Sequence, residues 1–177
     1  EKGNKLNLAK ADGSQLTKIV LGLGWDVAKG SASIDLDASC VLIDGSKEKV
    51  DVVWFRQLKS RCSSIEHTGD NRTGAGDGDD EQIKVDLTKV PSSVQSLVFT
   101  VNSFLGQSFD KIANAYVRVL DGTTELCKYD LGAKGPHTGM IMGKVYRHNG
   151  GWKFAALGEI ASGSTVDAIM PQIKNVC

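Results

Sequence analysis

The sequence predicts an all-β protein, a β-sandwich of two sheets with a few short helices, including one at the C-terminus. Two observations lead to this fold class. Apolar and polar residues alternate in many short segments, and turns rich in Gly, Asp, Asn and Ser separate these segments. This pattern is typical of antiparallel sandwiches and barrels. A chain of 177 residues can bury a substantial core, and we expect residues 1–177 to form one domain.

The predicted strands follow from the period of the alternation. Residues 34–43 show it clearly, because Leu36, Ala38 and Cys40 alternate with polar neighbours. Residues 50–55 are apolar on both faces, which predicts a central strand. The other predicted strands cover residues 6–8, 19–25, 83–87, 97–101, 115–119, 127–131, 140–146 and 152–156.

Helix is expected only in short pieces. Residues 91–94 and 108–113 favour single turns. In the tail, apolar residues recur at helical spacing from Val166 to Ile173, after the capping residues Ser164-Thr165. Pro171 lies inside this pattern and should kink or shorten the predicted helix, because it has no backbone N–H.

The charge balance excludes one class of function. The chain has 21 Lys and Arg residues and 21 Asp and Glu residues, so its formal net charge is zero. Non-specific nucleic-acid binding through a broad basic field is therefore not expected. No apolar run approaches the roughly 20 residues that cross a bilayer, and the first residues lack a signal-peptide core. We accordingly expect a cytoplasmic protein without a transmembrane segment.

The cysteines predict neither a disulfide framework nor a zinc site. Cys40, Cys62, Cys127 and Cys177 form no CxxC pair, and no His lies at zinc-finger spacing from them. Cys40 lies in an apolar segment and is expected in the core. The dispersed cysteines also offer no paired dithiol for redox chemistry.

The most informative segment runs from His67 to Glu81. Glycines interleave there with acidic residues, and only Arg72 offsets their charge. Carboxylates in a compact loop repel one another, so we expect a cation among them. Ca²⁺ fits better than Mg²⁺, because it takes six to eight oxygen ligands from the protein. The alternative is an acidic turn without a ligand, since Gly-Asp-Gly is also ordinary turn chemistry. The acids are Asp70, Asp77, Asp79, Asp80 and Glu81.

Three further acids lie on the neighbouring predicted strands. Asp26 follows a strand, whereas Asp35 and Asp37 are two residues apart and share one strand face. If the strands around Gly30 form a hairpin, Asp26 lies near that pair. The alternative is a solvated strand face, because Asp35 and Asp37 point away from the apolar side of the strand.

Other binding motifs do not fit the acidic segment. Counted from Asp70, an EF-hand has its last ligand at Glu81, but Arg72, Gly74 and Ala75 occupy positions that this motif gives to acids, amides and Gly. The segment lacks the Lys-Ser/Thr ending of a P-loop, and no GxSxG elbow occurs in the chain.

Together these motifs resemble the bacterial TerD family of tellurium-resistance and stress-response proteins, over nearly the whole chain. The matching segments are Gly22-Leu23-Gly24-Trp25-Asp26, Asp35-Leu36-Asp37-Ala38-Ser39, residues 67–74 and 76–81, Phe109, Asn114-Ala115-Tyr116-Val117-Arg118 and Trp152-Lys153-Phe154. The resemblance implies a β-sandwich that binds two neighbouring Ca²⁺ ions. It also implies a cytoplasmic protein whose partners are other stress-resistance proteins, some of them membrane-associated.

The resemblance also implies a set of calcium ligands. Two ions cannot use every side chain equally, so some of these residues would contribute a backbone carbonyl or support a direct ligand. The implied metal-binding residues are Asp26, Asp35, Asp37, Asp70, Asn71, Asp77, Asp79, Asp80 and Glu81.

We therefore expect a non-enzymatic Ca²⁺-binding protein of a stress response, with no catalytic residues. One alternative is a metal-dependent hydrolase, which would need a base such as His67 or Glu66. Another is a small-ligand-binding module in which calcium is structural. Some relatives are described as binding cyclic nucleotides, but no phosphate cradle is visible in this sequence.

Overall fold

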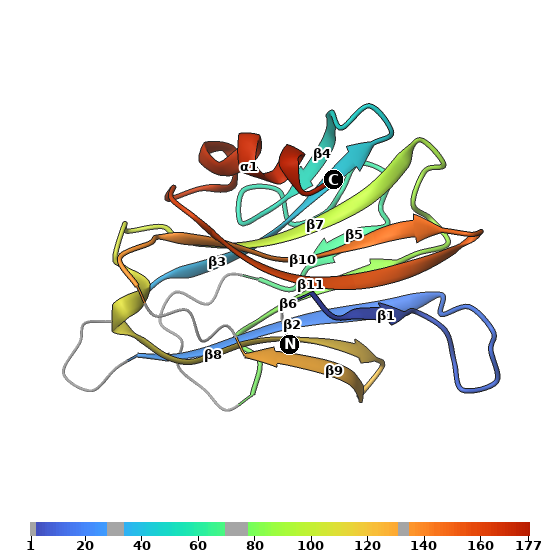
Figure 1. The fold of residues 1–177 in the computed structure, drawn as a ribbon, viewed down its shortest axis with the longest axis horizontal. Coiled ribbons are helices and arrows are strands. Elements are labelled where there is room, and N and C mark those ends of the chain that lie inside the picture. Colours follow the sequence, from blue (N-terminus) through green and yellow to red (C-terminus); the bar gives the residue numbers. More distant parts are fainter. Residues whose placement is uncertain (1–2, 28–33, 70–77, 131–134) are drawn as a thin grey trace.

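Two antiparallel sheets pack face to face in the computed structural model, which describes residues 3–27, 34–69, 78–130 and 135–177 (Figure 1). One sheet has the order β1-β11-β10-β7-β3-β4 and the other β5-β6-β2-β8-β9. The predicted fold class is therefore confirmed. The strands of the first sheet are β1 (Lys5–Asn7), β11 (Gly151–Ala161), β10 (Gly139–His148), β7 (Val94–Ser103), β3 (Leu36–Asp44) and β4 (Lys49–Val53). Those of the second are β5 (Ile65–His67), β6 (Glu81–Asp86), β2 (Lys18–Val27), β8 (Ile112–Asp121) and β9 (Thr124–Asp130).

The main core lies between the two sheets. Alternate residues of the paired strands face inward, so that Leu21 and Leu23 of β2 meet Phe99 and Val101 of β7 in one buried cluster. Cys40 belongs to this cluster and is fully buried, as its apolar surroundings predict.

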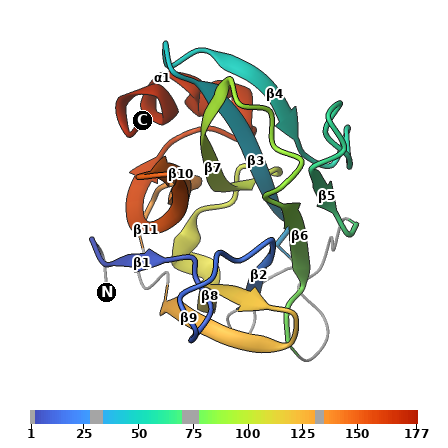
Figure 2. The ribbon, with the colours of Figure 1, turned by 90° about the vertical axis from the view of Figure 1, so that its right-hand side faces the viewer.

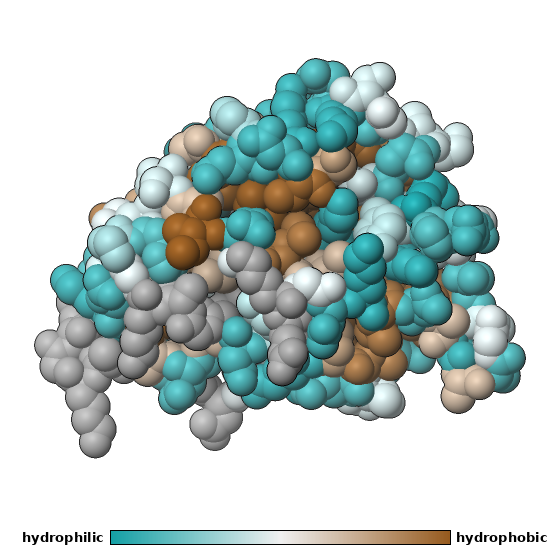
Figure 3. Space-filling model, in the orientation of Figure 1, coloured by the Kyte–Doolittle hydropathy of each residue, from teal (hydrophilic) through white to brown (hydrophobic). Residues whose placement is uncertain are grey.

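A second apolar cluster lies on the outer face of the six-stranded sheet, under the C-terminal segment. The 3-10 helix η2 (Val166–Ile169) and the helix α1 (Met170–Asn175) place Ile169 and Ile173 against Val41 and Val98. Apolar side chains gather where α1 lies on this sheet (Figure 3). Pro171 is in the first turn of α1, where a missing N–H breaks no helical bond. The predicted terminal helix is thus present and short, and a single 3-10 turn, η1 (Phe109–Lys111), lies within the predicted 108–113 segment.

The prediction that residues 50–55 form a central strand is wrong. β4 is the edge strand of its sheet. Its apolar residues are explained by two separate contacts, because Val53 faces the main core while Val52 and Trp54 pack beneath the C-terminal segment. A strand buried on both faces need not be central when a second layer covers its outer face.

The sandwich has one edge at which its two sheets are joined by a connecting loop. β4 ends one sheet, β5 ends the other, and residues 54–64 link them (Figure 2). Among the described residues, no helix is long and apolar enough to span a membrane.

Candidate functional site at the acidic end of the sandwich

The predicted acids that the structure describes lie at one end of the sandwich, where β2 ends and where β3 and β6 begin (Figure 1). Leu23 of β2 pairs with Glu81 of β6, and the Ala38 N–H of β3 donates to Glu81. Asp70, Asn71 and Asp77 lie outside the described residues. We use the name acidic end for Asp26, Asp35, Asp37, Asp79, Asp80 and Glu81.

The expectation of a hairpin around Gly30 is wrong. β2 pairs with β6 and β8, whereas β3 pairs with β4 and β7 in the opposite sheet. Both strands have an apolar face, and these faces pack against each other across the sandwich. A bond between the layers follows from this arrangement, because the Trp25 indole N–H donates to the carbonyl of Ile34 over 3.2 Å.

Glu81 joins the two sheets from the inside. It continues the inward face of Ile83 and Val85 and is only 1% exposed. Its Oε2 accepts a hydrogen bond from the Ala38 N–H at 2.7 Å and lies 3.1 Å from Nε2 of His67. A carboxylate buried this deeply is costly without such donors, so these contacts hold the sheets together at this end.

His67 is held in one tautomer by its neighbours. The Gly69 N–H donates to Nδ1 of His67 over 3.0 Å, so Nδ1 carries no proton. Nε2 therefore carries the proton and donates to Glu81. The ring is 2% exposed and both its nitrogens are engaged, which leaves no nitrogen to act as a base toward solvent.

Asp79 lies on the outer face of the five-stranded sheet. Its carboxylate accepts two hydrogen bonds from Arg118, from Nε at 2.8 Å and from a terminal nitrogen at 3.1 Å. Tyr116 and Gln82 donate to the same carboxylate. Burial alone would raise the pKa of Asp79, but the hydrogen bonds from these donors hold it below its usual value. The protein itself thus supplies the positive partner of Asp79.

Two glycines make room for this cluster. Gly22 pairs with Arg118 and Gly24 pairs with Tyr116 across the β2–β8 ladder. A Cβ on Gly22 would collide with the Asp79 carboxylate, and one on Gly24 would collide with the Tyr116 ring. The Gly22-Leu23-Gly24 motif therefore serves side-chain packing on the outer face, while Leu23 points into the core.

Asp80 is tied to an irregularity in β2. The register of β2 against β8 shifts between Gly24 and Asp26, and the Trp25 N–H donates to Asp80 Oδ2 over 2.8 Å. Burial raises the pKa of Asp80, the Trp25 hydrogen bond opposes that rise, and the negative charges of Asp26 and Asp79 add to it. The net result is a raised pKa. The negative charges of Asp26 and Asp79 therefore make ionisation of the Asp80 carboxyl less favourable.

Asp35 and Asp37 are buried, so the solvated-face alternative is wrong. They lie opposite Leu36 and Ala38, as predicted, but are only 6% and 5% exposed. Their face of β3 is the outer one, which the C-terminal segment covers further along the strand. Asp37 pairs with Asn102 of β7, which is itself buried. The sequence pattern predicts which strand face Asp35 and Asp37 occupy, but it does not predict that this face is covered.

The described residues alone do not complete a metal site. Within residues 3–27, 34–69, 78–130 and 135–177, no group of three or more His, Cys, Asp or Glu side chains is placed to hold an ion. Asp79 faces outward to Arg118 and Glu81 faces inward to His67, so these two diverge. Asp26 and Asp80 lie close enough for their charges to interact.

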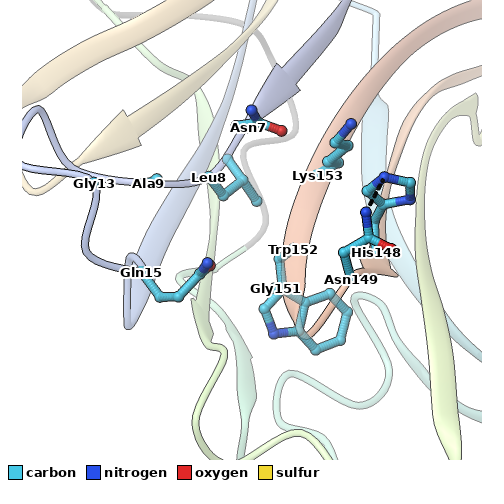
Figure 4. A pocket seen from close by; sticks show the side chains of 10 residues that line it. All are labelled: Asn7, Leu8, Ala9, Gly13, Gln15, His148, Asn149, Gly151, Trp152 and Lys153. Atoms are coloured by element: carbon cyan, nitrogen blue, oxygen red, sulfur yellow. Dashed lines mark hydrogen bonds between the residues drawn. The ribbon is translucent and has the colours of Figure 1, made fainter.

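A separate cavity lies at the opposite end of β2. It has a volume of about 420 Å³ and opens between the β1–β2 connection and the β10–β11 turn (Figure 4). The Trp152 ring lines it, while the guanidinium of Arg147 lies 4.3 Å from the centre of that ring. None of the predicted metal-binding residues lines this cavity.

Sequence reasoning missed the partners of the acids. Neither the Arg118–Asp79 ion pair nor the His67–Glu81 contact was predicted. The Arg118–Asp79 pair has one signal in the sequence: Tyr116 and Arg118 are two residues apart and therefore share one strand face. This signal can be interpreted only once the β2–β8 register is known, because that register places both residues over glycines.

The fold and the site together define a two-sheet β-sandwich with clustered carboxylates at one end. The TerD domain model matches residues 1–171. This chain therefore belongs to the TerD family. It is 46% identical over 177 aligned positions to the tellurium resistance protein TerZ of Serratia marcescens, covering 94% of this chain and 91% of TerZ. It is 39% identical to the stress response protein SCP2 of Bacillus subtilis, covering 96% of each chain.

Solved structures support the fold. SCO6318 from Streptomyces coelicolor A3(2), described as a homologue of the telluride resistance protein TerD, superposes with a TM-score of 0.73 at 21% identity. The match covers 88% of this chain and 95% of SCO6318. SAV2460, a protein of unknown function, gives a TM-score of 0.72 at 24% identity, covering 85% of this chain and 91% of SAV2460.

Proposed function

We propose that this chain is a non-enzymatic Ca²⁺-binding protein of a tellurite or chemical stress-resistance system. It binds two adjacent Ca²⁺ ions at the acidic end, with Asp70, Asn71 and Asp77 completing the ligand set. The observation that carries the proposal is the proximity of Asp26 to Asp80: burial is the main cause of the raised pKa of Asp80, and the negative charges of Asp26 and Asp79 further oppose its ionisation. A hard cation relieves that opposition.

The donor set fits Ca²⁺ better than a softer metal. Every residue in it offers oxygen, from a carboxylate or an amide, and the cysteines lie elsewhere. Asp79 has a supporting role and is not a direct ligand, because both of its carboxylate oxygens already accept hydrogen bonds from Arg118. Calcium bound here supplies positive charge and cross-links loops.

A hydrolytic role is less well supported. His67 is buried with both ring nitrogens engaged. Glu66 points to the other side of β5, where it lines a depression among lysines. Glu66 faces away from the acidic end, and His67 meets it through a buried hydrogen bond to Glu81.

Calcium binding is tested by melting and calorimetry. At a free Ca²⁺ concentration of 100 times the dissociation constant, each ion should raise the free energy of unfolding by about 2.7 kcal/mol. Titration calorimetry should give two ions per chain, and chelator should reverse the rise in melting temperature. Melting curves that coincide with and without Ca²⁺ would refute the proposal.

Matched substitutions locate the site. Asp26→Asn and Asp37→Asn should each weaken Ca²⁺ binding at least tenfold, because a carboxylate ligand is replaced by a neutral amide. Asp12→Asn is the control, since Asp12 lies in the β1–β2 connection and bonds Ser14 there. The stress role is tested in a deletion strain, in which the wild-type chain should restore survival in tellurite and Asp37→Asn should not.

A further inference from the structure

A tight turn on the β4–β5 edge presents unusual residues at its tip. Trp54 and Gln57 exchange two backbone hydrogen bonds, of 3.1 and 2.9 Å, so Phe55 and Arg56 are its central residues. Such positions are usually occupied by Gly, Pro, Asn, Asp or Ser. The turn belongs to the connection between β4 and β5 (Figure 2).

A second tight turn follows β7 and has an apolar tip as well. The Gly106 N–H donates to the Ser103 carbonyl over 3.1 Å, which places Phe104 and Leu105 at the centre of the turn. Leu105 is 65% exposed, and Phe104 is also exposed. Exposed apolar side chains at a turn centre gain nothing from the core, so their presence there indicates another contact.

The two turns form one surface. The rings of Phe55 and Phe104 meet edge to face, with centroids 5.3 Å apart. The Arg56 guanidinium carbon lies 5.4 Å from the Trp54 ring centroid and 5.5 Å from that of Phe55. We name this surface the aromatic tip, formed by Trp54, Phe55, Arg56, Phe104 and Leu105.

Positive charge continues along the same edge. Residues 56–61 contain three basic residues and no acidic one, with Leu58 exposed between them. Beyond them, lysines surround a depression of about 350 Å³ that also contains Glu66 and Asp86. Asp86 offsets part of this charge, because Lys18 and Lys89 interact with its carboxylate, and Lys84 lies opposite Glu66 across the β5–β6 ladder. The basic edge consists of Arg56, Lys59 and Arg61.

We propose that the aromatic tip and the basic edge dock this chain onto an anionic lipid bilayer. Lysine and arginine near such a surface are attracted by its negative potential. Aromatic rings favour the headgroup level, and an aliphatic side chain such as Leu105 reaches the acyl boundary. The charge concentration is notable in a chain whose formal net charge is zero.

The geometry favours a lipid surface over other anionic partners. Arg56 and Leu105 at the two turn tips are exposed, whereas Trp54 and Phe55 are half-buried, and a deformable bilayer accepts the exposed side chains without a preformed groove. Nucleic acid would use the cations and stack on the rings, but it offers no apolar layer for Leu105. The Phe104 N–H donates to the Asp35 carbonyl and so fixes the tip beside the acidic end.

Flotation with vesicles tests the proposal. The chain, in chelator, is mixed with phosphatidylcholine vesicles that contain or lack phosphatidylglycerol. It should float with the anionic vesicles and not with the neutral ones, and added salt should weaken binding. Circular dichroism confirms that each variant is folded.

Paired variants separate the apolar and the charged contributions. Phe104→Ser with Leu105→Ser should lower the partition coefficient about tenfold, whereas Ile160→Ser, at a side chain 54% exposed on β11, should not change it. Arg56→Gln with Lys59→Gln should weaken binding about fivefold per charge. Lys5→Gln with Lys10→Gln is the matched control on the opposite edge.

Three results would overturn the proposal. The first is no flotation with anionic vesicles at low salt. The second is an equal loss in the tip variants and their controls. The third is binding to soluble polyglutamate or to DNA without binding to vesicles, which would assign the surface to an acidic protein or to nucleic acid instead.

Discussion

Three consecutive acids, Asp79, Asp80 and Glu81, have three different environments. Asp79 bonds Arg118 on the outer face, Asp80 accepts the Trp25 N–H at the edge of β2, and Glu81 bonds Ala38 in the interior. The sequence predicts their charge and their proximity. It cannot predict their directions, because β6 begins at Glu81 and the preceding residues do not continue its alternation.

The first prediction at the residue scale concerns Asp79. Asp79→Asn should lower the free energy of unfolding at pH 7 by about 2 kcal/mol, because Arg118 and Tyr116 lose a charged acceptor. Glu125→Gln is the control, since Glu125 bonds the same guanidinium at an exposed site and should cost under about 0.5 kcal/mol. Urea unfolding of both variants measures the difference. Equal losses would contradict the central role of Asp79.

The effect of Asp79 should depend on pH in a defined direction. Its pKa in the folded protein is lower than the usual 3.8, so its stabilising contribution is complete above that value. The contribution is lost as pH falls through the lower pKa of the folded state. The difference between wild type and Asp79→Asn should therefore be constant near neutrality and shrink below about pH 4. A difference that grows on acidification would have the wrong sign.

At the scale of elements, β3 shows how a second layer changes the meaning of a pattern. The alternation correctly predicts the strand and the face of each residue. Its outer face is nevertheless buried: Asp35 and Asp37 are buried at one end, and Ile169 and Ile173 from the tail pack against Val41 further along the strand. The tail itself was predicted from its apolar spacing, whereas its docking place on Val41 and Val98 depends on residues far away in the sequence.

This docking gives a prediction for the C-terminal segment. Ile173→Ala should destabilise the fold by about 3 kcal/mol, because Ile173 is fully buried and its removal leaves a cavity. Gln172→Ala changes an exposed neighbour in the same helix and should cost much less. Chemical unfolding compares the two variants. If Ile173→Ala were as stable as Gln172→Ala, the tail would not be part of the folded core.

At the scale of the whole molecule, the sheet order was beyond the sequence pattern. β2 lies between β6 and β8, and β5, with three residues, was not predicted at all. Such pairings depend on side chains from distant strands, as when Asp79 and Tyr116 require Gly22 and Gly24. Alternation fixes which side of a strand is apolar. It does not state which strand lies beside it, and so the two-layer fold was predictable while its register was not.

The two layers meet at Glu81, and this contact gives the last prediction. In chelator, Glu81→Ala should destabilise the protein by about 3 kcal/mol, because the Ala38 N–H and His67 Nε2 both lose their buried acceptor. Glu81→Gln keeps one oxygen acceptor and should lose less. Chemical unfolding with chelator and with Ca²⁺ separates this role from metal binding. If Glu81→Ala lowered stability only in Ca²⁺, the carboxylate would act as a ligand and not as the link between the sheets.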